Sequence, residues 1–305
     1  MMHTRNSHDT ARRAGLAIAA LLTLQLAGCD QIAKWTSKPP ELKFAKYDAD
    51  YQSKQDFASV EHEYPLMPAD LNKLTPENLA NYDQEQVDQI YARLTAGPIP
   101  DGAFNGGLFF PKGQSGERRV SEIVGRLPGV AVELKSIKLE MLGGALWKGK
   151  VFYRDQRVLR NRIEDTVLLK PLIEGDLSKI PKITVEGRDQ WLMFPAKLYC
   201  GQSLLDSRRE SIIIDYFFTD EIEGYMQHPD YLAGRNGLQV RDEIRMVRPG
   251  FYLGRAYLGK AFLLNFTLIS PKIDEAESDA FRKTGQIKED CWPGTQKRAV
   301  LTAAQ

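Results

Sequence analysis

The second half of the chain is divided into short apolar runs separated by turn-forming residues. Eight such runs follow one another from Trp147 onward, at a spacing of roughly ten residues with a few longer gaps. Short strands at this spacing are typical of antiparallel barrels and sandwiches. Asn236-Gly237, a favoured hairpin turn, precedes one of them. The sequence therefore predicts a β-rich domain built from the runs Trp147–Tyr153, Val158–Ile163, Thr166–Ile173, Gln190–Leu198, Ser211–Phe218, Leu238–Val247, Phe251–Leu258 and Ala261–Ser270.

The last of these runs is apolar on both of its faces. Alternate residues of a strand point to opposite sides of a sheet, so each face can be read from the sequence. We expect one face to line a barrel interior and the other to be covered by helices or by a second sheet. The first face would carry Phe262, Leu264, Phe266 and Leu268, and the second Leu263, Asn265, Thr267 and Ile269.

Helices are predicted in the region that precedes the strands. Thr75 followed by Pro76 is a helix N-terminus signal. Apolar residues at i, i+3, i+4 and i+7 indicate a helix over residues 83–94, which ends before Gly97. A strand over residues 104–110 follows, and we favour a helix after Gly129, although residues 130–134 also alternate like a strand. The predicted fold class is β-rich α+β, an antiparallel barrel with one or two N-terminal helices.

The first 28 residues have the three parts of a bacterial export signal. Arg5, Arg12 and Arg13 form a basic start, and Ala14 to Gly28 form an uncharged apolar run. A relaxed transmembrane helix needs roughly 20 apolar residues, and this run is shorter. The pattern predicts a signal peptide that is removed.

A cysteine ends that apolar run. Leu26-Ala27-Gly28-Cys29 resembles the lipobox of bacterial lipoproteins, in which the chain is cut before the cysteine. The resemblance implies a diacylglycerol on the Cys29 thiol and a further acyl chain, such as palmitate, on its amino group, which together anchor stably. Asp30 resembles the residue that retains such proteins in the inner membrane of enteric bacteria, with the outer membrane as the alternative. The other interpretation of Cys29 is a buried cysteine in a signal-anchor helix.

Removal of the signal peptide changes the charge and the cysteine count. The mature chain would carry 38 basic and 39 acidic side chains, which argues against a nucleic-acid partner. We expect residues 29–60 to form a lipidated tether, rich in Lys, Asp, Gln and Pro, and residues 61–305 to form one periplasmic domain. Cys200 and Cys291 remain as a pair that an oxidising compartment would allow to form a disulfide.

Known catalytic motifs match the sequence poorly. Gly254 to Ala261 has the glycine and lysine spacing of a phosphate-binding loop, but Ala261 replaces the Ser or Thr that holds magnesium, so we predict a hairpin turn at Leu258 to Lys260. The glycine pattern of a serine hydrolase is incomplete near Ser115 and Ser203. Two histidines remain in the mature chain, too few for a histidine-rich metal site. No catalytic set, metal or cofactor is therefore assigned.

Polar residues within the apolar runs are the candidates for a site. Buried polar groups must be paired, so one hypothesis is a structural contact of Arg162 with Asp215 or with Asp242 inside a barrel. The alternative is that the residues line a pocket and orient a ligand. Asp242 is expected to share a face with Val240, Ile244 and Met246. The candidates are Asn161, Arg162, Asp215, Asp242 and Asn265.

Three functional classes follow from these observations. The spacing of the strands is similar to that of lipocalin-like barrels, and residues 144–150 resemble the Gly-x-Trp-x-Gly element of small bacterial lipocalin-like proteins, with a different spacing around Trp147. The first hypothesis is a membrane-anchored module that binds a lipid or other apolar small molecule. The second is an envelope accessory protein with a solid barrel, whose loops, such as residues 97–102, contact a protein partner. The third is an enzyme that uses Asp215 and Arg162 on a small carboxylate or hydroxyl substrate.

Overall fold

The computed structural model describes residues 39–46, 56–110, 147–164 and 177–294. The signal peptide, Cys29, Asp30, the helix expected after Gly129 and the run Thr166–Ile173 lie outside the described residues. Within the segment expected to be a tether, Ala45 is buried, and its backbone exchanges two hydrogen bonds of 2.9 Å with the Gln89 side chain.

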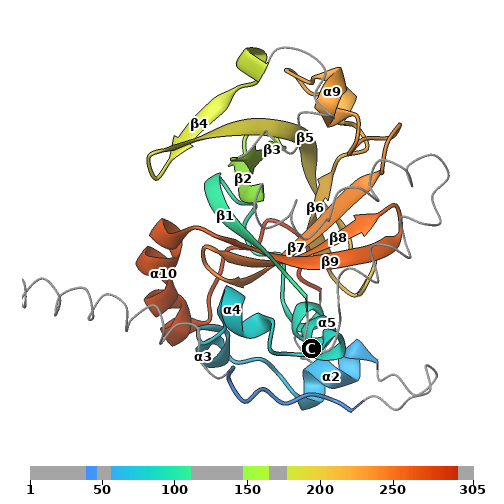
Figure 1. The fold of residues 1–305 in the computed structure, drawn as a ribbon. Coiled ribbons are helices and arrows are strands. Elements are labelled where there is room, and N and C mark those ends of the chain that lie inside the picture. The colour runs from blue at the N-terminus through green and yellow to red at the C-terminus, as the bar shows by residue number, and fades with distance from the viewer. Residues whose placement is uncertain (1–38, 47–55, 111–146, 165–176, 295–305) are drawn as a thin grey trace, which may run out of the picture. The chain divides into compact units, whose positions relative to one another are not determined.

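Eight antiparallel strands form a closed barrel (Figure 1). The order around the ring is β3-β2-β1-β9-β8-β7-β6-β5, and β5 pairs again with β3. A ninth strand, β4, pairs with β5 outside the ring. The predicted barrel is therefore confirmed. The strands are β1 Gly102–Phe109, β2 Trp147–Tyr153, β3 Val158–Ile163, β4 Lys182–Val185, β5 Arg188–Gln202, β6 Glu210–Asp215, β7 Val240–Arg248, β8 Phe251–Leu258 and β9 Ala261–Ile269.

Most strand boundaries follow the apolar runs. β2, β3 and β8 have the predicted limits, and the turn at Leu258 to Lys260 joins β8 to β9 as a hairpin, so the phosphate-loop match is a turn. β6 is shorter than its run, since the chain turns after Asp215. β4 was not predicted. It is a strand of only four residues with two exposed side chains, so it has little apolar pattern.

Most of the described helices lie before β1, a short one lies between β6 and β7, and one long helix follows β9. The predicted helix over residues 83–94 is α5, Gln84–Arg93, and Asp83 caps its first turn by accepting a hydrogen bond from the Gln86 N–H. Helix α10 was not predicted, because Phe281 is its one fully buried side chain and no apolar stripe marks it. The helices are α2 Phe57–Glu63, α3 Pro68–Leu71, α4 Pro76–Leu79, α5 Gln84–Arg93, α9 Gln227–Asp230 and α10 Pro271–Thr284, with short 3₁₀ turns at Leu177–Lys179 and Thr219–Glu221.

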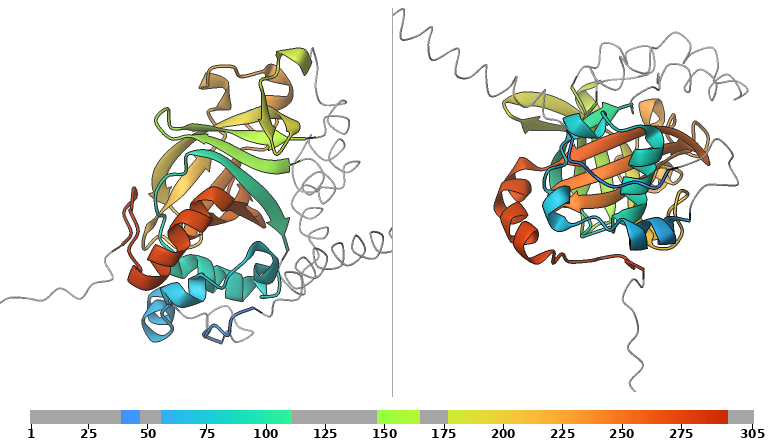
Figure 2. Two further views of the ribbon diagram at one scale, coloured as in Figure 1. Left: turned by 90° about the vertical axis from the view of Figure 1, so that its left-hand side faces the viewer. Right: turned by 90° about the horizontal axis from the view of Figure 1, so that it is seen from below.

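Two apolar cores lie on opposite sides of the barrel wall. The inner core includes Phe104, Phe152, Tyr252 and Phe266. The outer core joins α4 and α5 to β7 and β8, and Figure 2 shows these N-terminal helices (cyan) lying over the orange strands when the molecule is seen from below. Every residue of β8 is buried as a result. Burial of both faces, which we expected from the sequence of β9, is thus observed in this part of the wall.

Two residues of β9 lie on unexpected faces: Phe262 packs on the outer face, and Leu263, predicted to face outward, lies in the inner core. Tyr257 pairs with Phe262 but Ala256 pairs with Leu264, so an extra residue interrupts the alternation. A bulge of this kind shifts the side chains before it to the other side of the sheet. The Phe262 ring accordingly packs against the Arg255 guanidinium, 4.2 Å from the ring centroid, and against Tyr257. The prediction that Phe262 faces the interior with Phe266 is wrong.

Candidate functional site

An ion pair crosses the interior of the barrel. Lys150 comes from β2 and Asp242 from β7, which are four places apart in a ring of eight strands and therefore face each other. The Lys150 Nζ lies 3.0 Å from Asp242 Oδ2, and both residues are buried. The interior of an eight-stranded barrel is just wide enough to be filled by side chains. This pair spans that width.

Two further side chains complete a network that we call the interior cluster: Lys150, Asn161, Tyr216 and Asp242. The Lys150 ammonium donates to Asn161 Oδ1 at 2.9 Å, to the Tyr216 hydroxyl at 2.6 Å and to Asp242 at 3.0 Å. An ammonium has three protons, so all of its donors are used. The Asn161 amide donates to the Tyr216 hydroxyl and to the Phe194 carbonyl. The Trp147 indole N–H donates to Asn161 Oδ1 at 2.9 Å.

Protonation follows from this arrangement. Burial by itself would lower the pKa of Lys150, but Tyr216 and Asp242 outweigh that effect, and the pKa lies above its ordinary value. Burial raises the pKa of Tyr216 to about 12. At neutral pH Lys150 is therefore an ammonium and Tyr216 a neutral phenol. An amine in this state has no free lone pair, so Lys150 is not available as a base or nucleophile.

A backbone irregularity positions the Phe194 carbonyl, which accepts a hydrogen bond from the Asn161 amide. The β3–β5 register shifts near Phe194, and Phe194 has a φ of 51°, which is uncommon for a residue other than glycine. The buried Asp230 carboxylate accepts a 2.7 Å hydrogen bond from the Phe194 N–H and a second from the Met226 N–H. These contacts hold the Phe194 backbone where its carbonyl can accept from Asn161.

Aromatic rings fill the space around the interior cluster. Phe104 makes edge-to-face contacts with Phe152 and Tyr252, at centroid distances of 5.4 and 5.8 Å. Trp147 makes a similar contact with Phe266 at 5.8 Å. Gly254 gives Phe266 its room, because a Cβ there would lie 2.2 Å from the ring. The Phe266 ring is thus packed directly against the β8 backbone at Gly254.

A second set of buried and partly buried charges lies on the outer face of the wall. We call it the outer cluster: Asp88, Asp206, Arg208, Arg245 and Arg255. The fully buried Arg245 donates to Asp206 Oδ2 at 3.0 Å, to Ser211 and to backbone carbonyls at the end of α5. Asp206 also accepts from Arg208, and Arg255 pairs with Asp88 of α5. These contacts tie α5 and residues 206–209 to β7 and β8.

The structure separates the residues that the sequence proposed as one network. Asn161 and Asp242 meet in the interior cluster, and Asp242 has the predicted facing. Arg162 instead contacts Gln190, Asn105 and the Phe104 carbonyl, so a pairing with Asp215 or Asp242 was wrong.

The two remaining candidates lie at other places on the wall. Asp215 accepts from the Tyr199 hydroxyl and its own neighbour Phe217. Asn265 donates to Gln84 of α5. The pairings differ from the prediction because the closure of the ring, rather than local sequence, decides which strands face each other.

Lys150, Tyr216 and Trp147 are the site residues that the sequence reasoning missed. One signal was present. Lys150 lies two residues after Lys148 and two before Phe152 in its run. Residues two apart in a strand share a face, so Lys150 lies on the same face as Phe152. Phe152 faces the inner core, so the alternation also places this lysine inside.

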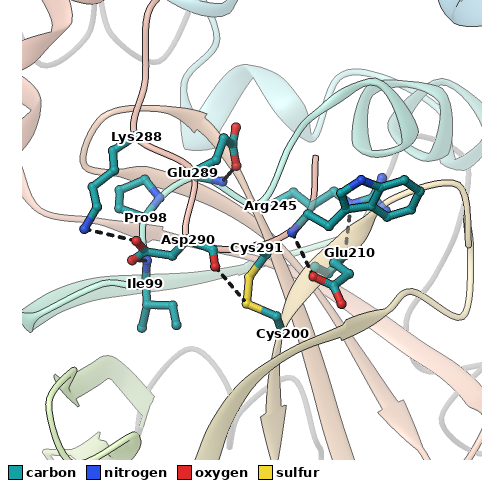
Figure 3. The surroundings of a disulfide bond; sticks show 12 residues. Pro98, Ile99, Cys200, Glu210, Arg245, Lys288, Glu289, Asp290 and Cys291 are labelled. Atoms are coloured by element: carbon teal, nitrogen blue, oxygen red, sulfur yellow. Dashed lines mark hydrogen bonds and ion pairs between the residues drawn. A yellow bond between two sulfur atoms is a disulfide. The ribbon is translucent and has the colours of Figure 1, made fainter. Parts of the chain in front are cut away.

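A disulfide joins Cys200 of β5 to Cys291, as predicted, with a Cα–Cα distance of 5.4 Å (Figure 3). The residues beside it, Glu289 to Trp292, form a segment that contacts β5, β6 and the loop before β1, which we call the C-terminal segment. Glu289 accepts from the Gly97 N–H and Asp290 from the Ile99 N–H. The Trp292 N–H donates to Glu210 at 2.8 Å. The disulfide therefore fastens this segment to the end of the barrel.

Comparisons with known proteins add little to this description. No family model and no curated protein matches the chain. A crystal structure of a protein from Thermomonospora curvata is 17% identical and covers 62% of this chain and 88% of that one, with a TM-score of 0.32, too low to support any conclusion. None of the described helices is long and apolar enough to cross a membrane. The fold places the described residues in the class of eight-stranded antiparallel β-barrels.

Proposed function

We propose that this protein is a membrane-anchored lipoprotein of the bacterial envelope whose barrel is a solid module for contact with a protein partner. The observation that carries the second half of the proposal is the ion pair between Lys150 and Asp242 across the interior. It favours the accessory protein over the lipid carrier, because both hypotheses require the same anchor but only the carrier requires an open barrel.

An apolar ligand in the interior would have to displace this pair. Moving one partner aside leaves a buried charge without compensation, which costs about 3–5 kcal/mol. The five aromatic rings packed in the inner core would also have to move. A carrier of lipids is better served by a wide, mostly apolar pocket with a few polar groups that have donors to spare. All three Lys150 donors are already used.

The enzyme hypothesis loses its geometric support. It required Asp215 and Arg162 to act on one substrate, but Arg162 is hydrogen-bonded to Gln190 and to residues of β1, and Asp215 to Tyr199 and the Phe217 N–H. The interior cluster is not a substitute, because its lysine is protonated and fully hydrogen-bonded.

Exposed apolar side chains support a protein contact. Among the described residues, Trp292 is 53% exposed, Tyr199 42% and Leu204 42%. All three lie within four residues of one of the two disulfide-bonded cysteines in sequence, whereas Met67 and Phe217, which are also exposed, do not. Exposed apolar side chains are a common feature of interaction sites.

The anchor is tested by labelling cells with an alkyne-bearing palmitate analogue. We expect label on the wild-type chain, recovered in the membrane fraction, and none on Cys29→Ser. Separation of inner and outer membranes then reports the localisation, for which Asp30 favours the inner membrane. Equal labelling of Cys29→Ser would contradict the anchor.

The solid barrel and the partner need a separate experiment. A photo-crosslinking amino acid at Leu204 or at Asp101, an exposed loop residue, is expected to give one reproducible crosslinked protein in living cells. The matched control is the same amino acid at the exposed Glu275 of α10. Native mass spectrometry of the chain extracted from membranes should show no additional mass beyond the acyl chains. A bound lipid that survives extraction, with no specific crosslink, would overturn the proposal in favour of the carrier.

A further inference from the structure

We infer that Cys200, Cys291 and Glu210 form a binding site for a divalent metal ion of the zinc type when the disulfide is reduced. Within the described part of the chain, these residues form a group whose sulfur and carboxylate oxygen atoms all lie within 4.8 Å of one another. Zinc is commonly held by thiolate and carboxylate ligands in this combination. The site would alternate between a disulfide and a metal-bound dithiolate.

The register of the sheet explains why Glu210 lies beside the cysteines. Cys200 pairs with Ile212, and Glu210 is two residues along the same strand, so its side chain shares the face of Cys200. Glu210 also accepts a hydrogen bond from the Trp292 N–H, next to Cys291, and its own N–H donates to the Trp292 carbonyl (Figure 3). The carboxylate is therefore held against both cysteine-bearing segments rather than placed there by a flexible loop.

The geometry suits a single ion. The Cα atoms of the two cysteines are 5.4 Å apart, which lets both sulfur atoms reach one metal at the usual zinc–sulfur distance of about 2.3 Å. Cys291 is buried, while Cys200 and Glu210 are partly exposed, so one side is open to solvent. Three protein ligands leave a fourth position for water.

The chemistry requires a reductant, for which we name a dithiol. A dithiol reduces the disulfide to two thiols and is itself oxidised to a disulfide, so two electrons and two protons are transferred. The metal ion then replaces the two thiol protons, which are released to solvent. Either state links the C-terminal segment to β5 through both sulfur atoms, and the metal-free dithiol leaves the segment held by its hydrogen bonds alone.

The test uses the full chain with Cys29→Ser in every variant, so that Cys200 and Cys291 are its two thiols. After reduction and removal of the reductant, Zn²⁺ is titrated by calorimetry, and Co²⁺ is titrated for the visible bands of a tetrahedral thiolate site. We expect one equivalent to bind to the reduced chain, with release of protons. Glu210→Gln should weaken binding by at least about tenfold, whereas Asp279→Asn, which changes an exposed carboxylate on α10, should leave it unchanged.

The oxidised chain provides the control that does not depend on the folding of a cysteine variant. It has the same sequence and no free thiol at the site, so it should bind neither Zn²⁺ nor Co²⁺. The inference is overturned if the oxidised and reduced chains bind Zn²⁺ equally. It is also overturned if Glu210→Gln binds as tightly as the reduced parent chain, or if Co²⁺ gives no thiolate bands.

Discussion

The interior cluster and the outer cluster bury charges on opposite faces of the same strand. Asp242 of β7 points into the barrel, and Arg245, three residues later, points outward. The interior cluster has one cation and one anion, with neutral partners that are bonded to one another. The outer cluster has several arginines and carboxylates that share partners. The number of ions on each side, rather than their burial, is the main difference.

This difference decides what happens when one ion is removed. Among the described residues, Lys150 is the one ion-pair partner of Asp242. Asp206 accepts from both Arg245 and Arg208, so it keeps a cation when either is lost. A network with shared partners tolerates the loss of a member better than an isolated pair does. The comparison therefore predicts unequal effects for substitutions that look equivalent.

The largest effect is expected for Lys150→Met. The substitution keeps most of the volume but leaves the Asp242 carboxylate buried without a cation, so the free energy of unfolding should fall by about 3–5 kcal/mol. Urea unfolding followed by circular dichroism measures it.

The matched control for Lys150→Met is the double variant Lys150→Met/Asp242→Leu, which removes both charges. It should recover most of the loss, since an apolar pair of similar volume often replaces a buried ion pair without cost. A loss below about 1 kcal/mol for the single variant would mean that water reaches Asp242, and the interior would then not be solid.

Arg245→Met should have the next largest effect, about 2–3 kcal/mol, although Arg245 is the more deeply buried residue. The Asp206 carboxylate keeps its two hydrogen bonds from Arg208. Arg208→Met is the matched single variant. Its guanidinium is 20% exposed, so we expect a smaller loss. The double variant should lose clearly more than the sum of the two singles, and simple additivity would show that the two arginines do not share Asp206.

The stabilisation from the interior cluster should be lost at high pH, and that from the outer cluster at low pH. The pKa of Lys150 is raised above 10.5, so its stabilisation is complete below that pH and is lost as the pH rises through the higher folded value.

The stabilisation from Asp206 changes with pH in the opposite direction. Burial would raise its pKa, but Arg208 and Arg245 lower it below 3.8 overall. Its stabilisation is present above pH 3.8 and is lost as the pH falls through the lower folded value. Urea midpoints measured across both ranges test this. Lys150→Met/Asp242→Leu should flatten the alkaline decline, and Arg245→Met the acid decline. The reverse assignment would contradict the comparison.

Local patterns in the sequence were sufficient for α5 and for most of the strands, with β4 as an exception, but not for the site. β3 and β8 are apolar runs bounded by turns, so their limits could be predicted. The pairing of Lys150 with Asp242 depends on the closure of the ring between β3 and β5, a contact that no neighbouring residues encode. The bulge beside Tyr257 similarly moved Phe262 to the outer face. The two-residue spacing of Lys150 and Phe152, which places both side chains on one face, was the one local signal for the interior cluster.

The smallest effect separates a hydrogen bond from the packing of a ring. Trp147→Phe removes the indole N–H that donates to Asn161 but keeps an aromatic ring beside Phe266. Asn161 Oδ1 still accepts from Lys150, so no buried acceptor is left alone, and the loss should be about 1 kcal/mol.

Trp191→Phe is the matched control, because its buried indole N–H has no hydrogen-bond partner among the described residues. Both variants replace an indole by a phenyl ring, so the difference between their unfolding free energies in urea reports the hydrogen bond to Asn161. Equal losses would show that Trp147 acts by packing alone. The hydrogen bond from the Trp147 indole to Asn161 would then add nothing measurable to the stability of the interior cluster.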